Sequence, residues 1–221
     1  MSGAMLFSQM TPPAGETERF EHWYDSDHIA HRMVLPGFTG AYRYWQQPDT
    51  PGAESHHLAI YDLESLDAVE TVQYNALKAH PGEQTDYFLS HVSGFTRFTT
   101  KRISDQGDTS ARGEFLSAVA FAVPDDYEAA FEDWYVNEHA PLLLEASDWL
   151  RVHRYRVVSG DGGPWTHIAL HELATLDVMD SPERAKARQG PKRDALAARA
   201  WFAGSGRWLY RRVAEHTAQQ S

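Results

Sequence analysis

The sequence contains no cysteine, which excludes disulfide bonds, thiolate metal sites and a cysteine nucleophile. It has no apolar run approaching the roughly 18 residues of a membrane-spanning helix, and its first residues lack the basic and apolar regions of a signal peptide. Positive charge is scarce, since 20 Lys and Arg oppose 31 Asp and Glu, for a net charge of −11. This balance argues against nucleic acids and anionic membranes as partners. We therefore expect a cytoplasmic protein.

Several common catalytic motifs are also missing. There is no G-x-S-x-G, no Walker A motif and no G-x-G-x-x-G after a strand, so the usual serine-hydrolase, NTPase and dinucleotide-binding signals are absent. The glycine-rich segment at 160–164 is predicted to be a turn, not a phosphate-binding loop. The basic run from Arg184 to Arg193 is predicted to be the solvated face of a helix, given the acidic total.

An internal repeat is the most informative feature that the sequence does contain. FEHWYDSDH at 20–28 matches FEDWYVNEH at 131–139, and HLAIYDLESLD at 57–67 matches HIALHELATLD at 167–177. A shorter pattern, G-x-x-R-aromatic, recurs at 94–98 and 204–208. Matches in the same order in three windows indicate a duplication. We predict a first repeat at 1–105 and a second at 114–221, with the boundary in the polar stretch Ser104–Gly113.

Hydrophobic periodicity changes in the same order in both repeats and predicts β-α-β-β-α-β twice. The first helix of the second repeat should be capped by Asp125 or Asp126, and Pro141 should end it close to His139. This order predicts an α+β fold of two tandem ferredoxin-like units. Each unit leaves one face of its sheet bare, and the two units can cover each other sheet to sheet. The predicted strands are Met5–Met10, Ala41–Gln46, Leu58–Leu63, Phe95–Ile103, Phe115–Val123, Arg151–Val158, His167–Leu173 and Arg207–Val213, and the predicted second helices are Leu66–Lys78 and Leu176–Arg188.

The helix signature F-x-x-W-Y-x-x-x-H, followed in the second repeat by Ala140-Pro141, resembles the EthD-like branch of the dimeric α+β barrel superfamily. In that superfamily two ferredoxin-like units, usually from two chains, pack sheet to sheet into a barrel with a cavity inside. The resemblance implies a fused tandem version that covers nearly all 221 residues. The first repeat departs from the pattern, with Ala30 in place of Pro141 and Asp27 in place of Glu138. The resemblance implies small-molecule chemistry, since the superfamily includes isomerases, cyclases, decarboxylases, cofactor-independent monooxygenases and haem enzymes.

Strand alternation predicts which side chains would face such a cavity. In the strand at 167–173, Ile168 and Leu170 share one face, and His167 and His171 share the other. We expect the aliphatic face to meet the helices and the histidines to face the barrel. A hairpin centred near Asp161-Gly162 would place His153 opposite His171 and, in the first repeat, Tyr42 opposite Tyr61. One half of the cavity would then be rich in histidine and the other in tyrosine.

Imidazoles titrate near neutral pH and tyrosine hydroxyls donate hydrogen bonds to oxyanions, so together they suit proton transfer on a carbonyl or phenolic substrate. The histidines at the helix ends could instead fix those ends by hydrogen bonds, the Phe-Trp-Tyr stripe is expected in the core, and His57 and His167 could simply satisfy backbone groups. The candidate catalytic residues are His171, His153, His167, His57, His139 and His28, and the candidate substrate-binding residues are Tyr155, Tyr44, Tyr61 and Tyr42.

The leading hypothesis is an isomerase, cyclase or lyase that uses histidine acid-base catalysis on an aromatic or polyketide-like carbonyl compound and needs no cofactor. The alternatives are a cofactor-free or haem-dependent monooxygenase, or a non-catalytic binding protein. No metal is expected, because His167 and His171 lie about 13 Å apart on a strand and cannot share one ion. A small-molecule substrate is the expected partner, and a homodimer is compatible with the fold.

Overall fold

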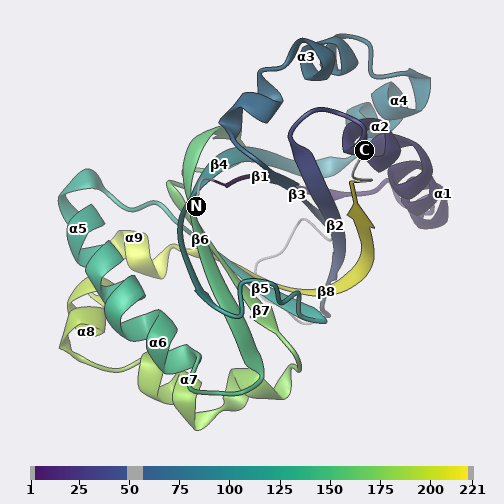
Figure 1. Cartoon of the computed structure of the whole chain (residues 1–221). Coiled ribbons are helices and arrows are strands. Elements are labelled where there is room, and N and C mark those ends of the chain that lie inside the picture. The colour runs from purple at the N-terminus through teal and green to yellow at the C-terminus, as the bar shows by residue number, and fades with distance from the viewer. Residues whose placement is uncertain (1–2, 49–56, 219–221) are drawn as a thin grey trace.

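The computed structural model describes residues 3–48 and 57–218, and in this part of the chain the strands form one closed barrel (Figure 1). Its order is β1-β3-β2-β8-β5-β7-β6-β4, and all neighbouring strands are antiparallel. The strands are β1 (Ala4–Thr11), β2 (Phe38–Gln46), β3 (His57–Leu63), β4 (Ser93–Gly107), β5 (Phe115–Phe121), β6 (Trp149–Asp161), β7 (His167–Leu173) and β8 (Gly206–Thr217).

The helices form two groups on opposite outer sides of the barrel (Figure 1). One group follows the strands of the first repeat: α1 (Thr17–Trp23), a π-helical segment (Tyr24–Ile29), α2 (Ala30–Met33), a 3-10 turn (Leu66–Val69), α3 (Val72–Ala79) and α4 (Glu83–His91). The other belongs to the second repeat: α5 (Asp125–Trp134), a π-helical segment (Tyr135–His139), α6 (Ala140–Leu143), a 3-10 turn (Asp177–Asp180), α7 (Pro182–Ala187), α8 (Pro191–Ala197) and α9 (Ala200–Ala203). None of the described helices is both long and apolar enough to cross a bilayer.

The predicted fold class is confirmed: two tandem ferredoxin-like units pack as a pseudo-dimeric α+β barrel. The units are joined through β2 with β8 and through β4 with β6, so each of these strands has a neighbour on both sides. The polar stretch predicted as a boundary begins inside β4, because Ser104–Gly107 pairs with Arg151–Arg154 of β6. The composition of this segment predicts a loop, but pairing with the other repeat holds it in an extended strand.

The prediction that the histidine-bearing face of the strand at 167–173 points inward is wrong, whereas Tyr42, Tyr44 and Tyr155 do face the barrel as predicted. Ile168 and Leu170 lie in the barrel interior, in one apolar cluster with Phe7, Leu58 and Tyr44. The opposite face of β7, which carries His167 and His171, packs against the helices. The physical reason is that both faces of β7 are covered, one by the other sheet and one by helices, so apolar character does not distinguish them.

The predicted hairpin register is off by one residue. His153 pairs with Leu170, whereas His171 pairs with Val152. In the first repeat Tyr61 pairs with Ala41. Because side chains alternate along a strand, a shift of one residue moves a side chain to the opposite face of the sheet. His153 and His171 therefore lie on opposite sides of β6 and β7 and do not meet.

Pro141 does not end the helix near His139 as predicted. The chain passes through a π-helical segment, in which the Ala140 N–H donates to the carbonyl of Tyr135, and then continues into α6. With the same spacing a residue at 141 would donate to Val136, but proline has no N–H. The Nε2 of Gln106 donates to that carbonyl instead, at 3.0 Å. Gln106 belongs to β4, so a strand of the first repeat completes the helix of the second.

A buried ion pair reinforces the seam between β4 and β6. Arg151 donates to both carboxylate oxygens of Asp105 at 2.7 and 2.6 Å, and the two side chains are only 3% and 5% exposed. Removing one partner of a buried pair leaves the other charge uncompensated, which typically costs about 3–5 kcal/mol. The exposed pair of Lys186 and Glu145 offers a matched contrast, because surface pairs contribute roughly 0–1 kcal/mol.

Asp105→Ala should therefore lower the free energy of unfolding by about 3–5 kcal/mol, because Arg151 would stay buried without a counter-charge. Glu145→Ala should change it by no more than about 1 kcal/mol. Urea unfolding followed by tryptophan fluorescence measures both. Equal effects of the two substitutions would contradict the importance of this seam.

Candidate functional site

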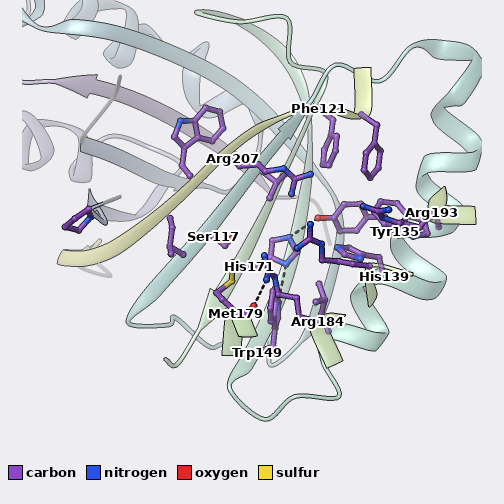
Figure 2. A pocket seen from close by; sticks show the side chains of 18 residues that line it. Ser117, Phe121, Tyr135, His139, Trp149, His171, Met179, Arg184, Arg193 and Arg207 are labelled. Carbon is purple, nitrogen blue, oxygen red and sulfur yellow. Dashed lines mark hydrogen bonds between the residues drawn. The ribbon is translucent and has the colours of Figure 1, made fainter. Parts of the chain in front are cut away.

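A cavity of about 370 Å³ lies between the outer face of the second repeat's sheet and the helices that cover it (Figure 2). The sequence predicted a cavity between the two sheets, so this position is a correction. Residues of β5, β7 and β8 form its floor, and α5 to α9 with their connecting segments form its walls. It is lined by Pro48, Ser117, Val119, Phe121, Trp134, Tyr135, His139, Leu143, Trp149, His171, Met179, Arg184, Arg188, Arg193, Phe202, Arg207, Trp208 and Leu209.

His171 forms the centre of a hydrogen-bonded chain in the cavity floor (Figure 2). The indole N–H of Trp149 donates to Nδ1 of His171 at 3.1 Å, and Nε2 lies 2.8 Å from the hydroxyl of Tyr135. An indole nitrogen can only donate, so Nδ1 accepts and the proton of the neutral ring is on Nε2. Nε2–H therefore donates to the Tyr135 oxygen. The hydroxyl hydrogen of Tyr135 is left free to donate to a ligand.

Burial keeps both members of this pair uncharged. Desolvation, with the neighbouring His139 and His153, holds the pKa of His171 well below its ordinary value. Burial likewise raises the pKa of Tyr135 above the ordinary tyrosine value. At neutral pH the site thus holds a neutral imidazole and a protonated phenol, which is the form that donates a hydrogen bond to a developing oxyanion.

His139 lies beside Tyr135 and His171, and only one of its two ring nitrogens is engaged in a hydrogen bond to a described residue. Its Nδ1 lies 2.9 Å from the carbonyl oxygen of Ala187, which can only accept, so Nδ1 carries the proton. Its ring stacks on Trp134, with 4.5 Å between centroids, and meets the ring of Tyr135 edge-on at 4.9 Å. Burial lowers the pKa of His139 to about 4. Nε2 is therefore an unprotonated acceptor at neutral pH, and it makes no hydrogen bond to any described residue.

The remaining walls are apolar and aromatic. Phe121 and Phe202 pack at 5.3 Å between ring centroids, and Phe202 packs against Trp134 at 5.6 Å. Leu143 and Val119 complete this surface. Such a lining suits a flat apolar ring, with the few polar groups left to fix its orientation.

The structure brings together two of the predicted catalytic histidines, His171 and His139, and separates the other four. His167 lies on the face of β7 that carries His171, but it packs edge-on against Phe131 and does not line the cavity. His153 points into the barrel, where it lies 3.1 Å from the Tyr155 hydroxyl and 3.2 Å from a carboxylate oxygen of Glu172.

The other predicted residues lie in the barrel or in the first repeat. Tyr42, Tyr44 and Tyr155 belong to the apolar cluster inside the barrel. Tyr61 packs between the first repeat's sheet and its helices, in the cluster that contains Phe20. His57 packs edge-on against Phe20 at 5.0 Å, and His28 lies 4.6 Å from the ring of Trp23. None of these six lines the described cavity.

The first repeat carries different residues at the matching positions. Tyr24 aligns with Tyr135 in the shared motif, and Tyr61 aligns with His171. Both tyrosines are buried, and burial raises the pKa of each. The first repeat thus lacks the imidazole that orients Tyr135 in the second.

A bulky ring also replaces a charged side chain in the first repeat. The N–H of Tyr74 donates to Thr71 at the start of α3, and the N–H of Arg184 donates to Ser181 at the start of α7, so the two positions are equivalent. Arg184 lines the cavity, whereas Tyr74 is 1% exposed and packs against Phe38 at 5.5 Å. The two repeats have therefore diverged at this place.

The sequence reasoning missed three features of the site. The core position predicted for Tyr135 is confirmed, but its place in the cavity was missed, although it precedes His139 by four residues in the motif and so shares its helix face. Trp149 gave no signal. The basic run is exposed at Lys186, Arg188 and Lys192 as predicted, but Arg184, Arg188 and Arg193 also line the cavity, which was not predicted. Their spacing of four and five residues was the available sign of a shared side.

Buried neutral histidines should make the protein sensitive to acid. Burial lowers the pKa of His167 to about 4. Between pH 6.5 and 4, this histidine is therefore protonated in the unfolded chain but neutral in the folded chain. The contribution of such a histidine to the free energy of unfolding is fully present above pH 6.5. It is lost as the pH drops, by up to about 3 kcal/mol. His167→Gln should make urea stability less dependent on pH between 7 and 5. If the urea stability of the variant depended on pH as strongly as that of the parent protein, His167 would not be the source of the acid sensitivity.

No family model and no curated protein sequence matches the chain. Solved structures do match over nearly its whole length. An anthrone oxidase-like protein has a TM-score of 0.66 at 12% identity, covering 99% of this chain and 94% of its own. A candidate monooxygenase from Fusobacterium nucleatum has a TM-score of 0.62 at 8% identity, covering 98% and 94%. A mutant chlorite dismutase from Candidatus Nitrospira defluvii has 0.54 at 11%, covering 96% and 92%. The chain therefore shares the dimeric α+β barrel fold of these proteins.

Proposed function

We propose that this protein is a cofactor-independent enzyme that moves a proton on an aromatic or polyketide-like carbonyl compound held in the second repeat's cavity. The observation that carries the proposal is the pairing of a free donor with a free acceptor. Tyr135 has an uncommitted hydroxyl hydrogen because His171 donates to its oxygen, and His139 has an uncommitted Nε2. We also place the chain in the EthD-like branch, on the signature that both repeats share.

In this mechanism Tyr135 donates its hydroxyl hydrogen to the carbonyl oxygen of the substrate. Nε2 of His139 accepts the proton from the adjacent carbon, and the resulting enolate oxygen is stabilised by the same tyrosine. His171 is a positioning residue, because its one lone pair already accepts from Trp149. The aromatic walls exclude water and so strengthen these interactions.

The fate of the enolate decides the reaction class. Return of the proton to another carbon gives isomerisation, and attack of the enolate on a second carbonyl gives cyclisation. Reaction with dioxygen converts a CH₂ group and one O₂ into a C=O group and one water, so the carbon is oxidised and the oxygen reduced. The resemblance to an anthrone oxidase-like protein and a candidate monooxygenase supports the oxidative outcome.

A haem-dependent reaction is the alternative suggested by the chlorite dismutase that shares the fold. The cavity residues do not fit it well. Both ring nitrogens of His171 are engaged, which leaves only Nε2 of His139 as an iron ligand. At about 370 Å³ the cavity is also at the small end of ligand pockets, which span about 300–1,000 Å³. An absorption spectrum of the purified protein with added haem tests this, and a Soret band that shifts in the parent but not in His139→Ala would favour the alternative.

Tyr135→Phe should lower kcat on an enolisable aromatic ketone such as anthrone by about 10²–10³, the effect of losing one oxyanion donor. Tyr24→Phe, which alters the matching position of the first repeat, should leave kcat unchanged. Oxygen uptake and product absorbance measure the rate, and thermal unfolding confirms that both variants fold. Turnover that resists Tyr135→Phe, or no turnover of any such ketone, would overturn the proposal in favour of a non-catalytic binding protein.

The pH dependence should identify the base. Because the pKa of His139 is lowered to about 4, kcat/KM should stay level from neutral pH down and fall only as the pH approaches 4. His139→Gln should lose most of the activity at every pH, since an amide cannot take the proton. An acidic limb near pH 6.5 would instead point to an exposed histidine of ordinary pKa.

A further inference from the structure

Four arginines line the cavity, and no acidic residue lines it. Arg184 and Arg188 come from α7 and its C-terminal end, Arg193 from α8 and Arg207 from β8. Figure 2 shows Arg184, Arg193 and Arg207 around the same space as His171 and Tyr135. Four positive charges gathered on one cavity stand out in a chain whose net charge is −11.

These arginines, which are exposed or half-buried, lack the carboxylate partners that the buried arginines Arg43, Arg151 and Arg154 have. Arg188 and Arg207 make no hydrogen bond or salt bridge to any described residue. Arg184 donates to the backbone carbonyl of Met179, and Arg193 contacts the exposed Asp194 at 3.5 Å and lies 5.9 Å from the ring centroid of Phe202. By contrast, Arg154 of β6 pairs with both carboxylate oxygens of Glu132.

The electrostatics of the cluster are unfavourable without a ligand. Burial and the positive charge of Arg188 lower the pKa of Arg207, and the same two causes lower the pKa of Arg184. Like charges that repel one another in a partly desolvated space are stabilised when an anion enters, because each guanidinium then gains charge-assisted hydrogen bonds. In the first repeat, Tyr74 fills the place of Arg184, and its ring lies 5.7 Å from Arg97, the counterpart of Arg207.

We infer that the substrate carries a carboxylate, which the cavity arginines bind while its ring system lies between the aromatic walls and its carbonyl faces Tyr135. This inference rests on the proposed function and adds the substrate class to it. A planar carboxylate matches the bidentate geometry of a guanidinium. The apolar walls select a ring, and the arginines fix the orientation of the molecule in the cavity.

Binding of a matched pair of probes tests the inference without any need for turnover. Anthraquinone-2-carboxylate and its carboxamide differ in charge and share the same rings. Trp134, Trp149 and Trp208 line the cavity, so quenching of tryptophan fluorescence reports occupancy. The carboxylate should bind at least about 10-fold more tightly, the loss expected when a charged hydrogen-bond partner is removed. Equal affinity for both probes would overturn the inference.

Substitutions then locate the preference. The double variant Arg188→Gln, Arg207→Gln should bind the two probes about equally. Arg211→Gln is the matched control, because Arg211 also lies on β8 but pairs with the exposed Glu114 outside the cavity, and it should keep the preference. A preference that survives in the double variant would place the anion elsewhere and contradict the assignment.

Two further measurements separate the possible sources of failure. Inorganic phosphate should compete weakly with the carboxylate probe; displacement at equal concentrations would show a general anion site and overturn the carboxylate assignment. Tyr135→Phe should retain the preference for the carboxylate even though it loses turnover. Loss of turnover with the preference intact therefore concerns the catalytic proposal, whereas loss of the preference in the parent protein concerns this inference alone.

Discussion

The need to cover both faces of each sheet governs this structure. A ferredoxin-like unit places its helices on one face and leaves the other face and two strand edges open. Here the second unit of the same chain closes them, through β2 with β8 and β4 with β6. The interior becomes a core in which Phe7, Leu58 and Leu170 meet. An eight-stranded barrel is just wide enough for side chains to fill. The space for a ligand is found instead outside, where helices do not fit the sheet closely.

Fusion of two units in one chain allows the two outer layers to differ. In the second repeat, His171 and Arg184 leave a polar, arginine-lined cavity under the helices. In the first, Tyr61 and Tyr74 are buried among the rings of the corresponding layer. In a symmetric dimer of identical chains, both outer layers would have the same residues, so one could not be packed while the other holds a cavity. The fused chain can hold one repeat as a packed support and adapt the other to a substrate.

The sequence predicted the architecture better than the site, and the reasons are physical. The repeat and the alternation of apolar residues located the strands, and the prediction of β7 at His167–Leu173 is confirmed. The inward face of β7 was predicted wrongly, because a strand covered on both sides has no polar face to mark solvent. The predicted pairing of His153 with His171 depended on a hairpin centred near Asp161-Gly162, and a register shift of one residue separates them. Contacts such as that of Trp149 with His171 depend on tertiary packing, which no local pattern encodes.

The bond from Gln106 to the carbonyl of Val136 ties the two repeats together at a sensitive point. It satisfies the acceptor that Pro141 leaves open, three residues before His139 along the same turn. The helix that presents Tyr135 and His139 is thus completed by a side chain encoded in the other half of the gene. The two halves therefore cannot evolve independently at this point. A substitution of Gln106 would alter the geometry of the repeat that holds the cavity.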